Sequence, residues 1–349
     1  MPAPGYVKSA DLEALPMIRR LLVWGKAARY HALPQIVMPW VLGGLVALAH
    51  GQFDALLYGV TLLGLVLAHL GTNLLDDCFD FATGSPLIRR DLQVQGVRAR
   101  MGKCQYILDG TMSIVETFLV AAGLFCLAFA VCLYLTWRCG WPVLAISVSA
   151  AVISLLYSAP PVRLSYRGLG ELTVGFTMGP LTVIGTYYVL TQQIRPEPIL
   201  ASIPIGLLIS NVLYCHSIMD FDADKANRKI TLAVALGSKG RAVAVLPVLI
   251  AVAYGTIVVG VVGGQLPSPL LLALVSAPMA IALVASMRGF LRDPEYEPPR
   301  RWWMGPMEHW DDVEAAGIGW FMVRWYMARN LLTATTLLIL LAWLIELGS

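Results

Sequence analysis

Charged residues are scarce in this sequence of 349 residues, and their scarcity argues against a soluble fold. Asp, Glu, Lys and Arg make up 13% of the chain and apolar residues 58%, with a mean hydropathy of +0.70. A soluble domain carries roughly 45–50% apolar and about 25% charged residues. The net charge of +3 is small and gives no indication of a nucleic-acid partner.

Metal-binding cysteine patterns and a signal peptide are also missing. The six cysteines form no CxxC pair and no Cys/His cluster, and most lie in or beside apolar runs, where a free cysteine behaves as a small hydrophobic side chain. We therefore expect neither disulfide bonds nor zinc. No cleavable signal is expected, because a mixed segment containing Lys8, Arg19, Arg20, Lys26 and Arg29 precedes the first apolar run.

The apolar residues are gathered in runs of about 20, the length at which a helix crosses a bilayer. Lipid offers no partner to backbone polar groups, so such runs must be helices or closed barrels, and these runs lack the alternation of barrel strands. We expect an all-α polytopic membrane protein with nine transmembrane helices around a central cavity that opens near the cytoplasmic face. The expected spans are residues 31–49, 55–76, 112–136, 141–157, 171–190, 199–218, 242–262, 267–287 and 326–346.

Basic residues are distributed unevenly between the two sides of these spans. All 25 lysines and arginines except Arg138 and Arg195 lie in the N-terminal segment or in connections that follow even-numbered spans. The positive-inside bias places those segments in the cytoplasm of a bacterium with the chain in its inner membrane, and an odd span count places the C-terminus outside. The expected parts are a cytoplasmic N-terminal segment, 1–30, and a single transmembrane domain, 31–349, with cytoplasmic loops at 77–111, 219–241 and 288–320.

The second expected span ends in a cluster of polar residues. Asn73, Asp76, Asp77 and Asp80 share one face of a helix of 3.6 residues per turn. Like charges one turn apart are mildly destabilising, and charges within a membrane segment are costly, so such a cluster needs a reason. For a single aspartate, a hydrated helix end is an adequate alternative explanation.

A second acidic cluster closes the sixth expected span, on the same side of the membrane. Asp220 and Asp224 are one turn apart, and His216 is one turn before Asp220, where it is as compatible with a general base as with an ordinary helix-end histidine. Mg²⁺ prefers oxygen ligands, binds one or two carboxylates and is completed by substrate phosphates. Two facing carboxylate clusters therefore favour a diphosphate that is bridged by metal ions over two unrelated hydrated helix ends.

At these residues the chain resembles the UbiA superfamily of intramembrane prenyltransferases, which has nine transmembrane helices, an Asn/Asp-rich motif after the second and a DxxxD motif after the sixth. The resemblance covers about residues 24 to 346 and is greatest for the branch that prenylates 1,4-dihydroxy-2-naphthoate in menaquinone synthesis. Four further stretches carry it: Trp24 to Arg29 with Leu33-Pro34; Tyr157 to Leu164; Gly168 to Leu172 with Gly185 to Val189; and Lys229 to Leu232.

The chain also departs from the pattern of the family. Its first motif reads Asp76-Asp77-x-x-Asp80, where the family usually begins with Asn, and Gly84 and Pro86 stand where related sequences often have Asp. His216, Ser217 and Met219 precede the second motif in place of the Asn and Arg typical of the menaquinone branch. These differences leave the diphosphate end intact and place the identity of the acceptor in question.

The resemblance implies a specific site. Two Mg²⁺ ions are expected, one on Asp77 and Asp80 with Asn73 and Asp76, the other on Asp220 and Asp224. The expected substrates are a polyprenyl diphosphate and an aromatic acceptor within membrane lipid, and no protein partner is indicated. The residues expected to neutralise the diphosphate are Lys229, Arg163, Arg228 and Lys103, and those expected in the substrate pocket are Tyr157, His216, Tyr187 and Tyr188.

Three alternatives remain open from the sequence. A prenyltransferase of the same family with another acceptor, or a membrane terpene cyclase, would use the same ionisation chemistry. A secondary transporter is less compatible, because its substrate site lies near the bilayer midplane, whereas these acidic clusters lie at one membrane face. The segment from Arg288 to Trp320, with Trp302, Trp303 and Trp310, is expected to lie at the membrane interface or to bind a partner.

Overall fold

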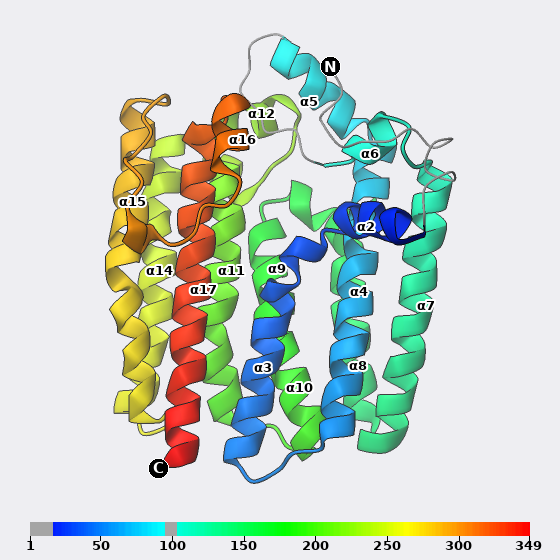
Figure 1. The fold of residues 1–349 in the computed structure, drawn as a ribbon, viewed down its shortest axis with the longest axis vertical. Coiled ribbons are helices and arrows are strands. Elements are labelled where there is room, and N and C mark those ends of the chain that lie inside the picture. The colour runs from blue at the N-terminus through cyan, green and yellow to red at the C-terminus, as the bar shows by residue number, and fades with distance from the viewer. Residues whose placement is uncertain (1–16, 95–102) are drawn as a thin grey trace.

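The computed structural model describes residues 17–94 and 103–349, which form a bundle of long helices capped at one end by short ones (Figure 1). Apart from an isolated bridge between Arg167 and Ile230, the regular structure of these residues is helical. The described elements are α2 (Met17–Ala27), η1 (Tyr30–Ala32), α3 (Pro34–Ala49), α4 (Ala55–Ala82), α5 (Ser85–Val94), α6 (Gln105–Leu108), α7 (Ile114–Cys139), α8 (Trp141–Ser158), η2 (Leu164–Tyr166), α9 (Gly170–Phe176), η3 (Thr177–Leu181), α10 (Thr182–Thr191), α11 (Pro196–Met219), α12 (Phe221–Ala226), α13 (Leu232–Ala235), α14 (Lys239–Val262), η4 (Ser268–Ser276), α15 (Ala277–Arg292), η5 (Trp302–Met304), α16 (Trp310–Ala315) and α17 (Gly319–Gly348).

Each of the nine expected spans is present as helix. Among the described residues, eight helices are long and apolar enough to cross a membrane by length and composition: η1 with α3, α4, α7, α8, α11, α14, η4 with α15, and α17. The remaining span, the fifth, was expected at 171–190 and consists of α9, the π-helical turn η3 and α10 in direct succession. Pro180 lies inside η3, and a π-turn is a common way for a helix to accommodate such an interruption.

Two helix ends lie beyond the expected limits. The second span was expected to end at residue 76, but α4 continues to Ala82. The charged residues of this last stretch are buried and paired, so they do not end the helix as a hydrated segment would. The ninth span was expected to begin at residue 326, but α17 begins at Gly319, because the stretch that follows it packs against neighbouring helices through Phe321 and Met322.

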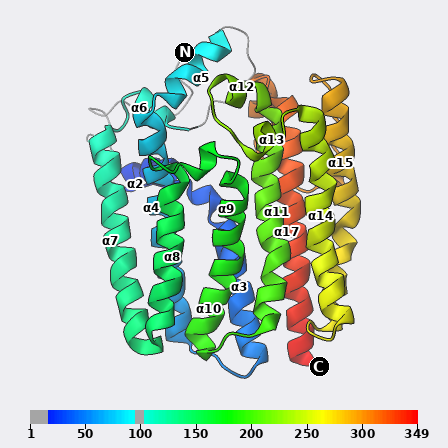
Figure 2. The ribbon, with the colours of Figure 1, turned by 180° about the vertical axis from the view of Figure 1, so that it is seen from behind.

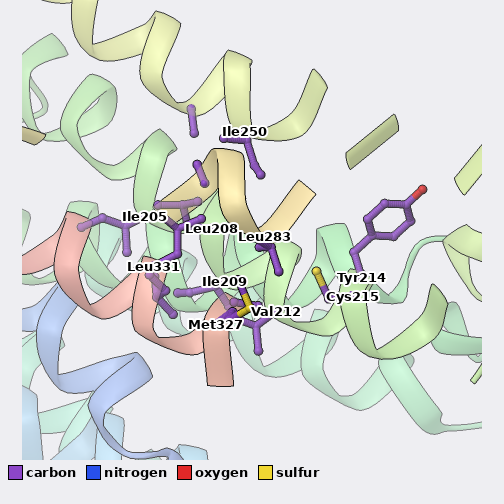
Figure 3. Close-up of a cluster of buried hydrophobic side chains, with 14 of the residues drawn as sticks. Ile205, Leu208, Ile209, Val212, Tyr214, Cys215, Ile250, Leu283, Met327 and Leu331 are labelled. Carbon is purple, nitrogen blue, oxygen red and sulfur yellow. The ribbon is translucent and has the colours of Figure 1, made fainter. Parts of the chain in front are cut away.

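Helix α11 is the central element of one half of the bundle. Its side chains are buried on nearly every side, and α9, α14 and α17 pack along it. Gly175 on α9 and Gly206 on α11 allow the two backbones to meet, since a Cβ at Gly206 would lie 2.8 Å from the Gly175 carbonyl oxygen. The contacts drawn in Figure 3 involve Ile205, Leu208, Ile209 and Val212 of α11, Ile250 of α14, Leu283 of α15, and Met327 and Leu331 of α17.

The other half of the bundle contains α4, α7, α8 and the composite helix α9–α10, seen from behind in Figure 2. Helix α4 packs along α7, and α10 packs along α3. The short helices α5, α6, α12 and α16 gather at the end of the bundle opposite the C-terminus (Figure 1). Both acidic clusters lie at that capped end, because α4 and α11 finish there.

Candidate active site

A cavity of about 1800 Å³ lies among the helices and reaches both acidic clusters. Its upper wall is polar and includes Asp76, Asp80 and Asp224. Its lower wall is formed mainly by apolar and small side chains of α4, α7, α8 and α10. The cavity therefore joins a charged head region to an apolar chamber.

The first cluster is a buried network on one face of α4. Asp76, Asp77 and Asp80 are each less than 8% exposed. Arg29, just before η1, forms ion pairs with Asp76 and Asp77 and donates to Asn73 Oδ1 at 3.0 Å. The carboxylates of this cluster thus meet a cation from a distant part of the chain.

A second cation reaches the same cluster from the segment before α6. Lys103 Nζ forms ion pairs with Asp76 and, at 3.0 Å, with Asp80. Ser158 at the end of α8 donates to Asp76, and the backbone N–H of Cys104 donates to Asp77 Oδ2 at 3.2 Å. These contacts draw α8 and the α6 segment onto the acidic face of α4.

The second cluster lies at the junction of α11 and α12. Arg89 of α5 forms ion pairs with Asp220, at 2.8 Å, and with Asp224. His216 Nε2 lies 3.1 Å from Asp220 Oδ2, and its ring packs edge-on against Phe321. Asp222 of the same stretch points away, is exposed and pairs with Lys239, so it provides a natural comparison for its neighbours.

The charges outside the spans stabilise one another. Burial alone would lower the pKa of Lys103, but the charges of Asp76 and Asp80 outweigh burial and raise it well above its ordinary value. Burial would raise the pKa of Asp220, but the hydrogen bond and charge of His216, together with Arg89, lower it below the ordinary range. Lys103 and Asp220 are therefore charged at neutral pH.

Tyr166 connects the first cluster to the loop that follows the second. Its hydroxyl donates to Asp80 Oδ1 at 3.2 Å. The Arg163 guanidinium lies over its ring, 3.5 Å from the centroid, and Lys229 Nζ lies 5.5 Å from it. Cations over an aromatic face are attracted by its quadrupole, so this ring positions Lys229 near the first cluster.

Glu171 anchors the loop that carries Lys229. It is 3% exposed, and its carboxylate accepts from the Ser217 hydroxyl at 2.6 Å and from the Leu232 backbone N–H at 3.2 Å. The Gly168 N–H also donates to the Ile230 carbonyl at 2.6 Å. The loop that carries Lys229 is thereby held between α9 and α11.

The structure brings most of the predicted site residues together. Tyr157, His216, Lys103 and Lys229 line the cavity with the acidic clusters, and Arg163 lies beside it on Tyr166. The remaining predicted cation, Arg228, is exposed and does not line the cavity.

Tyr187 and Tyr188, expected in the substrate pocket, lie elsewhere. Tyr187 is buried toward the opposite end of the bundle, where its hydroxyl lies 2.7 Å from His50 Nδ1. Tyr188 packs with Leu57 and Cys139 in a buried cluster. Neither lines the cavity, because Tyr187 is directed at His50 and Tyr188 at Leu57 and Cys139.

Five contributors were absent from the predicted site: Arg29, Arg89, Ser158, Tyr166 and Glu171. Three of them lie in stretches that carry the family resemblance, and that was the available signal. Tyr166 lies between two of those stretches, and nothing in its spacing marks it. Arg89 belongs to a basic run with Arg90, Arg98 and Arg100, of which the last two lie outside the described residues.

The donor set of the two clusters fits Mg²⁺ chemically. It consists of carboxylate and amide oxygens that face the cavity, which are the ligands this ion prefers. In the part of the chain that the structure describes, no three His, Cys, Asp or Glu side chains are arranged as a preformed metal cage. The carboxylates are instead paired with Arg29, Lys103 and Arg89, so a metal would replace one cation by another.

Comparison with known proteins identifies the class of protein. Residues 37–311 match the model of the UbiA prenyltransferase family, and the chain belongs to this family. It is 28% identical to 1,4-dihydroxy-2-naphthoate octaprenyltransferase of Bacillus subtilis (strain 168), over 78% of this chain and 83% of the relative. It is also 28% identical to 2-carboxy-1,4-naphthoquinone phytyltransferase of Synechocystis sp. (strain ATCC 27184 / PCC 6803 / Kazusa), over 80% of this chain and 86% of that relative.

The fold is also similar to that of solved UbiA structures. A UbiA homolog from Archaeoglobus fulgidus bound to GPP and Mg²⁺ superposes with a TM-score of 0.51 at 13% identity, covering 93% of this chain and 99% of that one. The predicted family and the predicted all-α membrane fold are thus confirmed. The protein is an integral membrane prenyltransferase of the UbiA family.

Proposed function

We propose that the protein transfers the prenyl group of a polyprenyl diphosphate to 1,4-dihydroxy-2-naphthoate, as a step in menaquinone synthesis. The observation that carries this proposal is that two buried acidic clusters and their cations face one cavity, the lower part of which is mainly apolar. A polar head and an apolar body match the two ends of a prenyl diphosphate. The names of the relatives, which act on naphthoate compounds, support the choice of acceptor.

Two Mg²⁺ ions are proposed as cofactors. One would be held by Asp77 and Asp80 with Asn73 and Asp76, and the other by Asp220 and Asp224. When bound, the ions would supply positive charge that stabilises the leaving diphosphate. A UbiA homolog from Archaeoglobus fulgidus bound to GPP and Mg²⁺ supports the choice of Mg²⁺ as the metal.

The cationic side chains of the site would, like the metal ions, stabilise the leaving diphosphate. Arg29, Lys103 and Arg89 would turn from their carboxylates to the diphosphate oxygens, and Lys229, held over Tyr166, would join them. Preorganised charges in a water-poor site stabilise a transition state far more than they would in water. These side chains therefore favour rupture of the C–O bond.

The proposed transfer balances as an aromatic substitution. The bond between the first prenyl carbon and the diphosphate oxygen breaks, and its electron pair leaves with the diphosphate. The ring carbon that bears the acceptor carboxylate gives an electron pair to the allylic cation. Carbon dioxide then leaves, and its bonding pair returns to the ring. His216, held by Asp220 at the cavity wall, is placed to orient a ring hydroxyl.

The helices around the cavity exclude water from the allylic cation. Tyr157 and Phe125 line the cavity and can stabilise a cation through their ring faces. We place the acidic end in the cytoplasm of a bacterium, with the chain in the inner membrane, because the basic residues concentrate at that end.

Turnover in nanodiscs tests the proposal. The full chain is incubated with Mg²⁺, geranylgeranyl diphosphate and aromatic acceptors that include 1,4-dihydroxy-2-naphthoate, and products are followed by mass spectrometry. We expect a prenylated naphthoate that disappears when Mg²⁺ is chelated. Asp77→Asn and Asp220→Asn should reduce kcat/KM at least a hundredfold, whereas Asp222→Asn should leave it unchanged, since Asp222 faces away from the cavity.

Two results would overturn the proposal. A cyclised hydrocarbon formed with or without acceptor would identify a terpene cyclase. Transfer to another aromatic ring, with none to the naphthoate, would retain the reaction and replace the acceptor.

A further inference from the structure

A second, smaller pocket lies between α15, α17 and the connection that follows α15. It has a volume of about 260 Å³, whereas a single buried water needs roughly 10–15 Å³. The small side chains of Ala282 and Ala285 on α15 leave the space open, Met327 of α17 also lines it, and residues of the connection between 298 and 304 complete the lining. Among the described residues, only Trp303 lines both this pocket and the active-site cavity. The pocket is therefore a separate space, large enough for a polar group of many atoms.

The exposed face of α15 changes from apolar to charged at the level of this pocket. Four exposed residues at spacings of four, three and four share that face: Ile281, Ala285, Arg288 and Arg292. Ile281 is 70% exposed, as expected of a side chain that faces lipid, whereas both arginines lie toward the end of the helix. Trp303 in the pocket lining is an amphipathic ring of the kind that concentrates at bilayer interfaces. The pocket thus lies where lipid headgroups are expected.

Two arginines at this pocket have no carboxylate partner within the part of the chain that the structure describes. Arg301 lines the pocket, is exposed and forms no ion pair there. Arg324 of α17 is fully buried, and its hydrogen bonds go to the backbone carbonyls of Ser286, Trp320 and Tyr296. Since Ser286 and Tyr296 line the pocket, Arg324 lies directly behind its wall. A buried cation whose partners are neutral makes the pocket favourable for an anion.

Ser286 adds a hydroxyl that also lacks a partner. The residue is 4% exposed and lines the pocket, and its Oγ has no hydrogen-bond partner among the described residues. Another buried serine in a helix, Ser210, instead donates to the carbonyl four residues earlier. Buried polar groups are nearly always hydrogen-bonded in folded proteins, so this hydroxyl indicates that a polar ligand completes the pocket.

We propose that this pocket binds the phosphate group of an anionic phospholipid, with an acyl chain along the exposed face of α15. The Arg301 guanidinium would bind two phosphate oxygens, the arrangement for which its planar fork is suited, and the Ser286 hydroxyl would donate to another lipid oxygen. Asp293 and Glu297 act electrostatically on Arg324 but do not line the pocket, so they do not occupy the place of the phosphate. Basic pockets between membrane helices are known sites for anionic headgroups. This inference is independent of the reaction that the protein catalyses.

The test measures lipid binding. The full chain is delipidated in detergent and titrated with phosphatidylglycerol or phosphatidylethanolamine, and bound lipids are counted by native mass spectrometry. We expect the first phosphatidylglycerol to bind at least tenfold more tightly than the first phosphatidylethanolamine, whose ammonium offsets the charge of its phosphate. Arg301→Gln should weaken the binding of phosphatidylglycerol at least fivefold and leave that of phosphatidylethanolamine unchanged.

Two further variants separate charge from space. Ala285→Leu keeps every charge but fills the pocket from the exposed face of α15, so it should weaken the binding of phosphatidylglycerol as Arg301→Gln does. Arg300→Gln is the matched control. Arg300 pairs with Glu314 and lies over the ring of Trp310, outside the pocket lining, so its loss should leave both affinities at the parent's values.

Three results would overturn the inference. The parent could bind both lipids equally, or Arg301→Gln could bind phosphatidylglycerol as tightly as Arg300→Gln does. Displacement of phosphatidylglycerol by millimolar inorganic phosphate would identify a site for a free anion instead of a lipid. Each of these readouts is a binding affinity, so none depends on whether a prenyl group is transferred.

Discussion

Single residues of the candidate site are partnered across long stretches of sequence. Asp77 is bound by Arg29 and by the backbone of Cys104, and Asp220 by Arg89 and His216. A buried charge is tolerated only when it is paired and hydrogen-bonded, so these partners are a condition for carboxylates at this depth. The same pairing means that each carboxylate can be released only if its cation finds another anion, and a diphosphate is such an anion.

Tyr166 offers a test at this scale. Tyr166→Phe keeps the ring that holds Arg163 and Lys229 but removes the hydroxyl that donates to Asp80. A hydrogen bond to a charged group is worth about 1.5–3 kcal/mol. We expect the affinity for a prenyl diphosphate with Mg²⁺ to fall about tenfold, measured by titration. Tyr134→Phe, whose hydroxyl contacts only Arg138 on the same helix, is the control, and equal affinities for both variants would contradict the role.

Glu171 offers a second test. Glu171→Gln conserves shape but replaces one acceptor oxygen with a donor facing the Leu232 N–H and the Ser217 hydroxyl. A buried polar group without its partner costs about 1–3 kcal/mol. We expect a lower thermal unfolding temperature in detergent and a raised KM for the diphosphate substrate, since the loop of Lys229 loses its anchor. Glu346→Gln, at the exposed end of α17, should change neither quantity.

At the scale of elements, α9 and η3 meet α11 through glycines. Gly175, Gly179 and Gly206 bring the backbones so close that a Cβ on any of them would lie within 2.9 Å of a neighbouring atom. The π-turn η3 lies at this crossing and places Thr177, Met178 and Leu181 on the cavity wall. The close approach of these helices thus shapes the cavity.

Gly206→Ala tests the crossing. The added methyl would lie 2.8 Å from the Gly175 carbonyl oxygen and from Pro180 Cδ. Overpacking of this kind costs about 1–3 kcal/mol. We expect a lower unfolding temperature, followed by calorimetry or a thiol-reactive dye. Gly123→Ala has open space around it and should be neutral or stabilising, so a similar loss in both variants would refute the packing argument.

The tryptophan-containing segment between α15 and α17 is held by side chains of α17. Asn330 Nδ2 donates to the Met304 and Pro306 carbonyls at 2.8 and 2.9 Å, and Arg329 pairs with Glu308. Trp302 is 92% exposed on this segment. The connection is therefore a fixed strap on the flank of α17, with an indole directed outward, as expected of a residue at a membrane interface.

Asn330→Ala should release this strap. The loss of two donors leaves the carbonyls of Met304 and Pro306 without those bonds, so we expect amide hydrogen exchange across residues 302–309 to accelerate at least tenfold. Thr333→Ala is the matched control, because its hydroxyl bonds only to the Arg329 carbonyl of its own helix. Unchanged exchange in Asn330→Ala would show that the strap is held by other contacts.

At the scale of the whole molecule, the acidic clusters, the short capping helices and most basic residues share one end, and the C-terminus lies at the other (Figure 1). The proposed orientation can be tested with a membrane-impermeant maleimide. Of the six cysteines, Cys126 is the exposed one, so the parent for labelling carries Cys126→Ser. Asp222→Cys should then react only in inside-out vesicles and Gln193→Cys only in right-side-out ones, and the reverse pattern would invert the orientation.

Local chemistry in the sequence was enough to predict the class of protein. Runs of apolar residues predict membrane helices, because in lipid the backbone can hydrogen-bond only within the helix. Two motifs whose aspartates are one helical turn apart predict where a polar site lies. The helix ends were less well predicted, as α4 and α17 show, because the end of a span was inferred from where charges begin. Buried, paired charges do not end a helix.

Contacts between distant segments were decided by the tertiary structure alone. Arg29, Lys103 and Arg89 reach the aspartates from other segments, and Tyr166 joins two loops that are remote in sequence. Tyr187 and Tyr188 show the converse, since their place in a motif did not put them on the cavity wall. The sequence determined that this is a helical membrane protein with two acidic motifs, through periodicity and solvation. Which cations meet those motifs, and which side chains line the cavity beneath them, depends on helix packing that no local pattern encodes.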